Sequence, residues 1–169
     1  ITELKEKIKN IVFGTSLEGK LLRVGDLHIE GAVAALLKDA VVGMIVVDNA
    51  NEETVMVVSE EGYGKRSVVE DYRLTNRGGK GVKTLNITEK TGKLVAIKNV
   101  TDKNDLMIIN QSGIVIRLSV AECRVMGRAT QGVRLINLAK KNDVIASVCK
   151  VMSAEMEEHV EEEEHSQTA

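Results

Sequence analysis

Short apolar runs separated by turn-forming residues fill the middle of the chain. The runs are rich in β-branched residues, and clusters of Gly, Asn, Asp and Ser lie between them. This alternation predicts short strands joined by hairpins, and helical periodicity is weak here. The predicted strands are residues 43–47, 54–58, 63–69, 82–87, 94–100, 106–109, 114–120, 133–138 and 144–151. The pattern therefore predicts an all-β fold.

The same pattern occurs twice, because residues 55–87 align without a gap on residues 106–138. Gly62 coincides with Gly113 in this alignment, and several arginine, valine and asparagine positions coincide as well. Both glycines are predicted to adopt the positive φ of a tight hairpin turn. Four antiparallel strands in a repeat of about 50 residues are typical of a propeller blade. We therefore expect a partial β-propeller or β-pinwheel.

The two ends of the chain depart from the regular repeat. Gly19 and Arg23 reproduce the Gly-x-x-x-Arg spacing of the two good copies, whereas residues 31–40 are alanine-rich and could be helical. The last predicted strand resembles the start of another copy. The predicted organisation is a short helix (residues 1–10) plus a shortened, degenerate first blade in residues 1–40, two well-formed blades and a closing strand in residues 41–152, and a disordered acidic tail in residues 153–169.

Charge is distributed unevenly along the chain. The net charge is -2, yet residues 152–169 hold seven glutamates and no Lys or Arg, whereas residues 61–134 hold 14 basic and 7 acidic residues. A basic body with an acidic end is typical of nucleic-acid binders, because Lys and Arg displace counterions from phosphates. The tail either competes for the basic surface or stays a solvated end, and the sequence leaves both open.

Composition excludes several other functions. With 169 residues and 43% hydrophobic residues, the chain reads as a soluble globular protein, and no apolar run reaches the roughly 18 residues of a membrane span. Cys123 and Cys149 are far apart, so we expect two buried, reduced thiols and no disulfide or zinc site. Aromatic residues make up 2% of the chain, which does not favour base stacking. The scattered histidines and carboxylates indicate no metal site.

A glycine-rich basic loop is the main candidate for chemistry. Residues 75–81 read Thr-Asn-Arg-Gly-Gly-Lys-Gly, and such glycines let backbone N–H groups approach a phosphate closely. A nucleotide pocket is one option, but the Walker spacing is absent because Lys80 is followed by Gly81. A DNA backbone is the other option. The matching loop at residues 127–132 keeps Arg128 and Gly132.

A basic patch on each repeat suits an extended polyanion better than one small ligand. The spacing alone leaves solvated propeller faces as the alternative. The predicted DNA-binding residues are Lys65, Arg66, Arg73, Arg77, Gly78, Gly79, Lys80, Gly81 and Lys83 in the first good copy, and Arg117, Arg124, Arg128 and Arg134 in the second.

Three motifs in register with the repeat resemble the C-terminal domain of the A subunit of bacterial DNA gyrase. They are Gly-Tyr-Gly-Lys-Arg at residues 62–66, Asn-Arg-Gly-Gly-Lys-Gly-Val at residues 76–82 and Val-Met-Gly-Arg-Ala-Thr-Gln-Gly-Val at residues 125–133. The family's box, Gln-Arg-Arg-Gly-Gly-Lys/Arg-Gly, is matched from Arg77 to Gly81 and departs at Thr75 and Asn76. In the family this box belongs to the first blade, whereas here the loop belongs to the penultimate complete repeat.

The resemblance implies a β-pinwheel whose basic rim wraps double-stranded DNA and supports ATP-dependent negative supercoiling by the whole enzyme. In that family six blades form a disc, of which this chain would supply a part. The implied partners are double-stranded DNA, the rest of the same gyrase polypeptide, and the B subunit of an A2B2 complex. The implied location is the bacterial cytoplasm, with no membrane contact.

The resemblance also implies that this segment is not catalytic. The family's nucleophilic tyrosine lies in another domain, and neither Tyr63 nor Tyr72 matches its context; Tyr63 is expected near the rim and Tyr72 in the packing beside the loop. No cofactor is expected here, since ATP and magnesium would act on other domains. The alternatives are the equivalent C-terminal domain of topoisomerase IV, a β-propeller scaffold for protein partners and, third, a nucleotide-binding enzyme.

Overall fold

The structure, a computed structural model, describes residues 11–15, 19–24, 41–74, 81–128, 130–138 and 143–154. Its strands are β1 (Ile11–Thr15), β2 (Lys20–Val24), β3 (Val41–Val46), β4 (Thr54–Ser59), β5 (Tyr63–Val68), β6 (Val82–Lys83), β7 (Leu94–Val100), β8 (Asn104–Asn110), β9 (Val115–Ser119), β10 (Val133–Arg134) and β11 (Ile145–Met152). A 3-10 turn, η1, covers Val69–Asp71. The helices expected in residues 1–10 and 31–40, and the tail from residue 155, lie outside the described residues.

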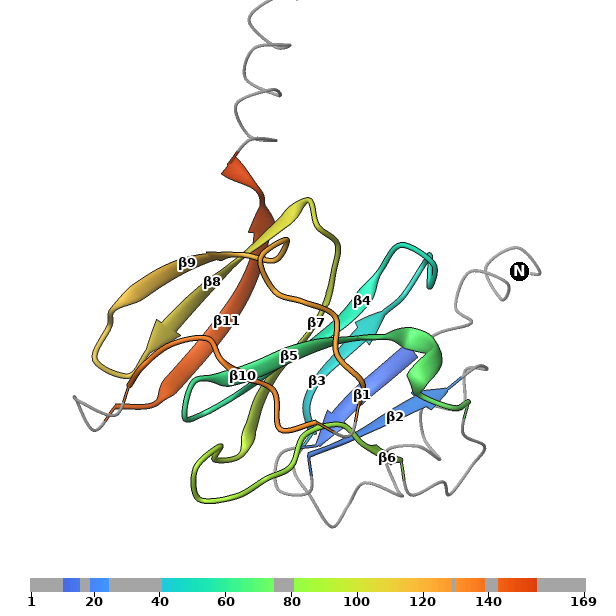
Figure 1. Ribbon diagram of the computed structural model, residues 1–169, viewed down its shortest axis with the longest axis horizontal. Coiled ribbons are helices and arrows are strands. Elements are labelled where there is room, and N and C mark those ends of the chain that lie inside the picture. Colours follow the sequence, from blue (N-terminus) through green and yellow to red (C-terminus); the bar gives the residue numbers. More distant parts are fainter. Residues whose placement is uncertain are drawn as a thin grey trace, which may run out of the picture.

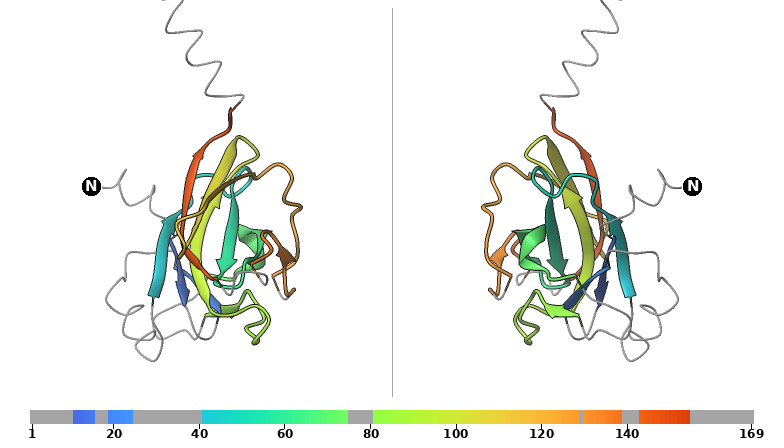
Figure 2. Two further views of the ribbon diagram at one scale, coloured as in Figure 1. Left: turned by 90° about the vertical axis from the view of Figure 1, so that its left-hand side faces the viewer. Right: turned by 90° about the vertical axis from the view of Figure 1, so that its right-hand side faces the viewer.

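The strands form three antiparallel sheets that lie side by side (Figure 1). The first sheet has the order β3-β1-β2-β6, the second β10-β5-β4-β7 and the third β11-β8-β9. The inner strands β3, β7 and β11 together line a groove of about 600 Å3. Figure 2 shows the inner strand β3 and the outer strand β10 on opposite sides of the molecule. The predicted all-β, propeller-like fold is confirmed.

The outer strand of each complete sheet comes from the next repeat. β6 follows the second sheet's hairpin but pairs with β2 of the first sheet, with Val82 opposite Leu21. β10 pairs in the same way with β5 of the second sheet, with Val133 opposite Gly64. Each connecting loop therefore crosses to the preceding sheet before the chain returns to its own.

The two outer strands are shorter than the sequence predicts. Strands were expected at residues 82–87 and 133–138, but each pairs over two residues. The reason is the hydrogen bonding that follows: the N–H groups of Thr84 and Leu85 both donate to the Gly19 carbonyl, at 2.9 and 3.3 Å. Two successive donors on one acceptor cannot continue a ladder, so the chain leaves the edge.

The last strand of each copy returns to that copy's own hairpin. β3 pairs with β1, and β11 pairs with β8. The domain boundary expected at residue 41 therefore falls inside the first sheet. Residues 144–151, which resemble the start of another copy, instead complete the third sheet.

The hydrophobic core lies in two layers between neighbouring sheets. β4 contributes to both layers, because Val55 and Val57 face the first sheet and Met56 and Val58 face the third. Strands buried on both faces read as continuous apolar runs, which explains the sequence of β4. Tyr72 is fully buried in the first layer, and its hydroxyl lies 2.6 Å from Thr84 Oγ1, as its predicted packing role requires.

The two cysteines differ in exposure. Cys123 is buried in the second core layer, whereas Cys149 is exposed. The expectation of two buried thiols is therefore wrong for Cys149. This residue lies on β11, where Ile145 and Val148 are buried and the residues between and after them are exposed or partly exposed. Among the described residues, no strand other than β8 pairs with β11.

The hairpin glycines take the predicted conformation but differ in their surroundings. Gly62 and Gly113 have φ values of 79° and 83°. A Cβ on Gly62 would lie 2.7 Å from the Ile136 carbonyl oxygen of the crossing chain, whereas a Cβ on Gly113 would meet nothing within 4 Å. The first turn is therefore covered by the next repeat, and the second is open.

This difference predicts that a Gly→Ala substitution lowers the free energy of unfolding by unequal amounts at the two turns. Gly113→Ala should lower the free energy of unfolding by about 1–2 kcal/mol, because alanine is strained at positive φ. Gly62→Ala adds a backbone clash to this strain and should cost clearly more, on the order of 3 kcal/mol or above. Urea unfolding of both variants measures the difference. Equal losses would contradict the covered and open turns described here.

Candidate nucleic-acid interface

Three of the sequence-predicted cations meet in one surface groove. The groove has a volume of about 380 Å3 and is lined by Asp71, Arg73, Gly81, Val82, Lys83 and Arg128. Arg73 follows η1, Lys83 ends the outer strand β6, and Arg128 precedes β10, so three separate segments build it. We call these six residues the rim groove. It exists because β6 crosses to the first sheet and brings Lys83 beside the loop of the third repeat.

Positive charge dominates the rim groove. Arg73 and Lys83 are exposed and Arg128 is half-buried, against the single carboxylate of Asp71. Arg128 Nη1 lies 3.5 Å from the Lys83 carbonyl oxygen, and Lys83 Nζ donates to Asn86 Oδ1 at 2.9 Å. Cations held this close together repel one another, so an anion in the groove is stabilised.

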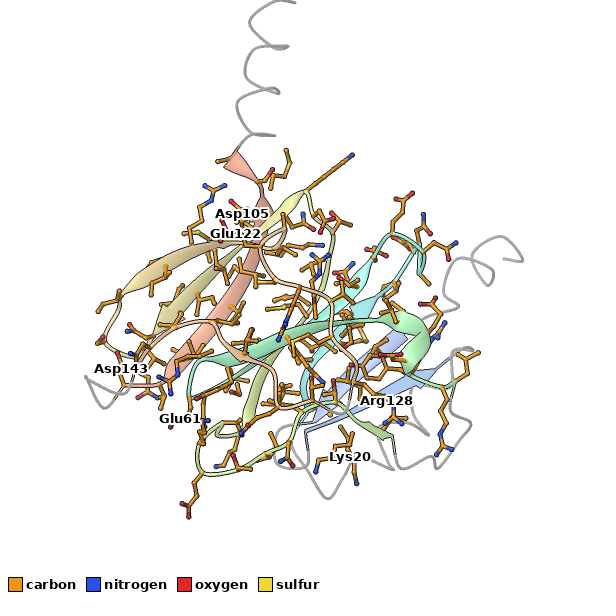
Figure 3. All side chains as sticks on the ribbon, viewed as in Figure 1. Lys20, Glu61, Asp105, Glu122, Arg128 and Asp143 are labelled. Atoms are coloured by element: carbon orange, nitrogen blue, oxygen red, sulfur yellow. The ribbon has the colours of Figure 1, made fainter. Side chains whose placement is uncertain are left out.

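Four other carboxylates lie away from the rim groove. Figure 3 places Arg128 and Lys20 beside the first sheet, whereas the labelled carboxylates of Glu61, Asp105, Glu122 and Asp143 lie over the second and third sheets. Two of them are already engaged: Asp105 pairs with Arg117, and Asp143 Oδ2 accepts a 2.6 Å hydrogen bond from Ser112. This bond holds the pKa of Asp143 below its ordinary value.

The cation positions recur one repeat later. Arg124 and Arg134 are the equivalents of Arg73 and Lys83, and both are exposed. Arg134 lies over the Tyr63 ring, 5.4 Å from its centroid, and donates to the phenol oxygen from Nε and Nη2 at 3.2 and 2.9 Å. Lys90, which sequence reasoning did not select, lies 5.6 Å from the same ring. The hydrogen bond from Arg134 lowers the pKa of Tyr63, and the charge of Lys90 adds to this effect.

Lys65 is not on the surface where it was predicted. Its side chain is 1% exposed. Nζ donates to the Gly127 carbonyl at 2.9 Å, to the Arg128 carbonyl, and to the carbonyl and hydroxyl of Thr130 at 3.2 and 3.3 Å. Burial lowers the pKa of Lys65 to about 8, with Asp71 opposing and Arg128 reinforcing the shift. The amine is therefore engaged by oxygen atoms of Gly127, Arg128 and Thr130 and is buried beneath them.

The guanidinium groups of Arg66 and Arg117 also bond to other residues of the chain. Arg66 is 8% exposed; Nη1 donates to the Val120 carbonyl at 2.9 Å and Nη2 pairs with Asp102 at 2.6 Å. Arg23, at the equivalent position of the first copy, donates to the Val69 carbonyl in the same manner. Arg66 thus joins the second sheet to the third repeat. Arg117 is partly exposed, but its guanidinium contacts Asp105 and the Met152 carbonyl of its own sheet.

The core of the predicted glycine-rich loop lies outside the described residues. This applies to Arg77, Gly78, Gly79 and Lys80. The chain on both sides of this segment lines the rim groove, at Arg73 and at Gly81. Gly81 has a φ of 71°, and a Cβ there would lie 3.0 Å from the Leu21 carbonyl oxygen. Its glycine is therefore needed for the crossing to the first sheet, whatever else the loop does.

Within the described ranges, no group of three or more His, Cys, Asp or Glu residues could hold a metal ion. The same part of the chain contains no helix with the length and apolar character needed to cross a bilayer.

A family model described as "DNA gyrase C-terminal domain, beta-propeller" matches residues 53–101 and 104–149. These ranges contain the second and third hairpins and most of the cations named above. The chain belongs to the DNA gyrase C-terminal domain family. The matched ranges follow the two good copies of the repeat, and their ends fall close to the start of β4 and the end of β11.

Curated relatives support this membership. The DNA gyrase A protein of Staphylococcus aureus (strain NCTC 8325 / PS 47) is 48% identical over 130 residues, which are 77% of this chain and 14% of the relative. The DNA gyrase A protein of Staphylococcus epidermidis is 41% identical over 152 residues, 85% of this chain and 17% of the relative. The chain thus spans a small part of the relatives it matches.

Solved structures share the fold. A DNA gyrase A C-terminal domain superimposes with a TM-score of 0.71 at 20% identity, covering 86% of this chain and 52% of that one. The C-terminal domain of a DNA topoisomerase IV gives the same TM-score at 15% identity, covering 86% of this chain and 47% of that one. The three sheets correspond to about half of each solved domain.

The lowered pKa of Lys65 predicts how stability varies with pH. Between about pH 8 and pH 10.5 the unfolded chain holds a proton on this amine that the folded chain has lost. Stability conferred by this group therefore rises with pH across that window, by at most about 1.4 kcal/mol per pH unit. The Lys65→Met variant lacks this rise.

The measurement is urea unfolding of both proteins from about pH 7.5 to pH 9.5, with the difference in free energy plotted against pH. The other titrating groups cancel in this difference. A constant difference would show that Lys65 has an ordinary pKa in the folded chain.

Proposed function

We propose that this chain binds and bends double-stranded DNA as part of the C-terminal, DNA-wrapping domain of a DNA gyrase A protein. The observation that carries the proposal is the rim groove, in which Arg73, Lys83 and Arg128 from three segments face solvent together. Family membership and the curated gyrase relatives support it. Arginine and lysine side chains of this kind bind phosphates without reading bases.

The repeated placement of cations favours a long ligand. Lys83 and Arg134 occupy equivalent positions on successive outer strands, and Arg73 and Arg124 on successive turns before the loops. Neighbouring sheets are rotated with respect to one another (Figure 1), so positions that repeat from sheet to sheet follow a curve. A duplex that contacts them all has to bend, and the free energy of its phosphate contacts offsets the cost of bending.

We extend the proposal to the role of this domain in the whole gyrase. Such a domain would support ATP-dependent negative supercoiling by an A2B2 complex with the B subunit in the bacterial cytoplasm. The breakage chemistry, ATP and magnesium would belong to other domains, so this segment would act by binding alone. The equivalent domain of topoisomerase IV remains the alternative on fold, since its TM-score equals that of the gyrase domain. The gyrase relatives at 41–48% identity favour gyrase.

Removing the cations of the rim groove should weaken binding of all sequences alike. The triple variant Arg73→Gln, Lys83→Gln, Arg128→Gln loses three phosphate contacts, so the slope of log K against log salt should fall by about 2–3. Fluorescence anisotropy with duplexes of different sequence at several salt concentrations measures this. Lys103→Gln, which removes one exposed charge outside the groove, is the control. Sequence-selective loss, or an unchanged slope, would contradict backbone binding at this groove.

DNA wrapping has a topological signature of its own. Ligation of nicked circular DNA in the presence of the chain should shift the linking number, and the triple variant should reduce the shift. Two-dimensional agarose gels give both its size and its sign. DNA retention without any change of linking number would reduce the proposal to DNA binding without wrapping.

A further inference from the structure

The buried amine of Lys65 has an unusual set of neighbours. It is held by oxygen atoms of Gly127, Arg128 and Thr130, and no carboxylate of the described residues contacts it. Its side chain is 1% exposed, so the ammonium is satisfied by carbonyl dipoles in place of water. The oxygen atoms surround the ammonium of Lys65, a residue of β5, much as backbone carbonyls surround a bound monovalent cation.

Drawing the carbonyls inward fixes the direction of the neighbouring N–H groups. In a trans peptide unit the C=O and the following N–H point in opposite directions, and the described chain has no cis peptide. The inward carbonyl of Gly127 therefore turns the Arg128 N–H outward, and the inward carbonyl of Thr130 turns the Gln131 N–H outward. Within the described part of the chain, neither N–H has a protein acceptor.

These outward N–H groups belong to the loop that borders the rim groove. The loop residue Arg128 lines the groove together with Arg73 and Lys83. Successive backbone N–H groups that point to one side form an anion-binding concavity, and a nearby guanidinium strengthens it. The buried charge of Lys65 lies beneath the same loop, where low dielectric screens it weakly. The combination has the donors and the field that a phosphate requires.

We propose that Gly127, Arg128, Thr130 and Gln131 form a seat for one phosphate group, bound by the N–H groups of Arg128 and Gln131 and by the Arg128 guanidinium, with Lys65 as the positioning residue that organises the seat without touching the ligand. The phosphate is a phosphodiester of DNA, and in this respect the proposal rests on the proposed function. The binding of a free anion at the seat does not depend on the proposed function.

The proposal separates Lys65 from the exposed cations. Without its ammonium, the carbonyls of Arg128 and Thr130 lose this donor and turn toward water, whereas the Gly127 carbonyl keeps the Thr130 N–H and hydroxyl as donors, at 3.3 and 3.0 Å. Rotation of the Thr130 carbonyl takes the Gln131 N–H away from the ligand. Lys65→Met keeps the length and apolar stem of the side chain and removes only the charge and its hydrogen bonds. Its loss of DNA affinity is therefore indirect, and it is visible in the loop before any DNA is added.

The direct experiment follows backbone amides of the 15N-labelled chain by NMR at about pH 7 while inorganic phosphate is added. In the wild-type chain the Arg128 and Gln131 amides should shift in a saturable manner. In Lys65→Met these amides should start from different positions and no longer respond. Lys83→Met, which leaves the loop contacts of Lys65 intact, is the matched control and should keep the response with weaker affinity.

A second measurement uses DNA and pH at constant ionic strength. Lys65→Met should bind a short duplex about tenfold more weakly than the wild-type chain, as expected for losing one hydrogen-bonded phosphate contact. Raising the pH through about 8, where Lys65 loses its proton, should bring the wild-type affinity down to that of the variant. Asp71 and Arg128 are the charged groups that act on this proton. The variant's own affinity should stay flat.

The outcomes separate this proposal from the proposed function. A Lys65→Met chain that binds phosphate and DNA as the wild type does would overturn the seat, and so would a wild-type chain that binds DNA with no response at the Arg128 and Gln131 amides. An amide response to phosphate in a chain that retains no DNA would support the seat and refute DNA binding. If Lys65→Met fails to fold, the pH profile of the wild-type chain decides, and a flat profile counts against the proposal.

Discussion

The exchange of outer strands between neighbouring sheets is the constraint on which the rest of the structure depends. β6 and β10 each pair over two residues with the sheet before their own, and Gly81 and Gly132 adopt positive φ where each crossing begins. The crossing places a cation of one repeat beside the loop of the next, as Lys83 and Arg128 show. The candidate interface is therefore a consequence of connectivity, and no single sheet contains it.

The same residue types hold the sheets together and face the solvent. Arg23 and Arg66 donate to the carbonyls of Val69 and Val120, which are equivalent positions in successive copies. A buried guanidinium that meets a carbonyl adds direction to an interface whose hydrophobic contacts have none. Arg73, Lys83 and Arg128 instead line the rim groove. A count of charges over residues 61–134 includes both the arginines that join sheets and the cations that line the rim groove. Such a count therefore overstates the basic surface that is available to a polyanion.

The repeat in the sequence predicted the sheets well, but it could not assign each strand to its sheet. Alternating apolar residues indicate that a strand is half-buried but do not identify its partner strand. The repeat therefore did not show that the strands within residues 82–87 and 133–138 pair with the preceding sheet. Lys65 was misassigned for a similar reason, because composition does not report burial. The alignment held one signal: Ile116 stands at the position of Lys65 in the second copy, and an apolar residue there indicates an inward-facing site.

The third sheet shows what happens where the exchange is not repeated. Among the described strands, no outer strand pairs with β9, and Gly113 keeps the turn conformation without the carbonyl that covers Gly62. Ile114 and Val115, which follow this turn, are 38% and 50% exposed. Each sheet thus depends on the following repeat for its outer edge and for the cation that this edge carries. Lys83 and Arg134 are the cations that the outer strands carry, and among the described residues the third sheet has no counterpart of either.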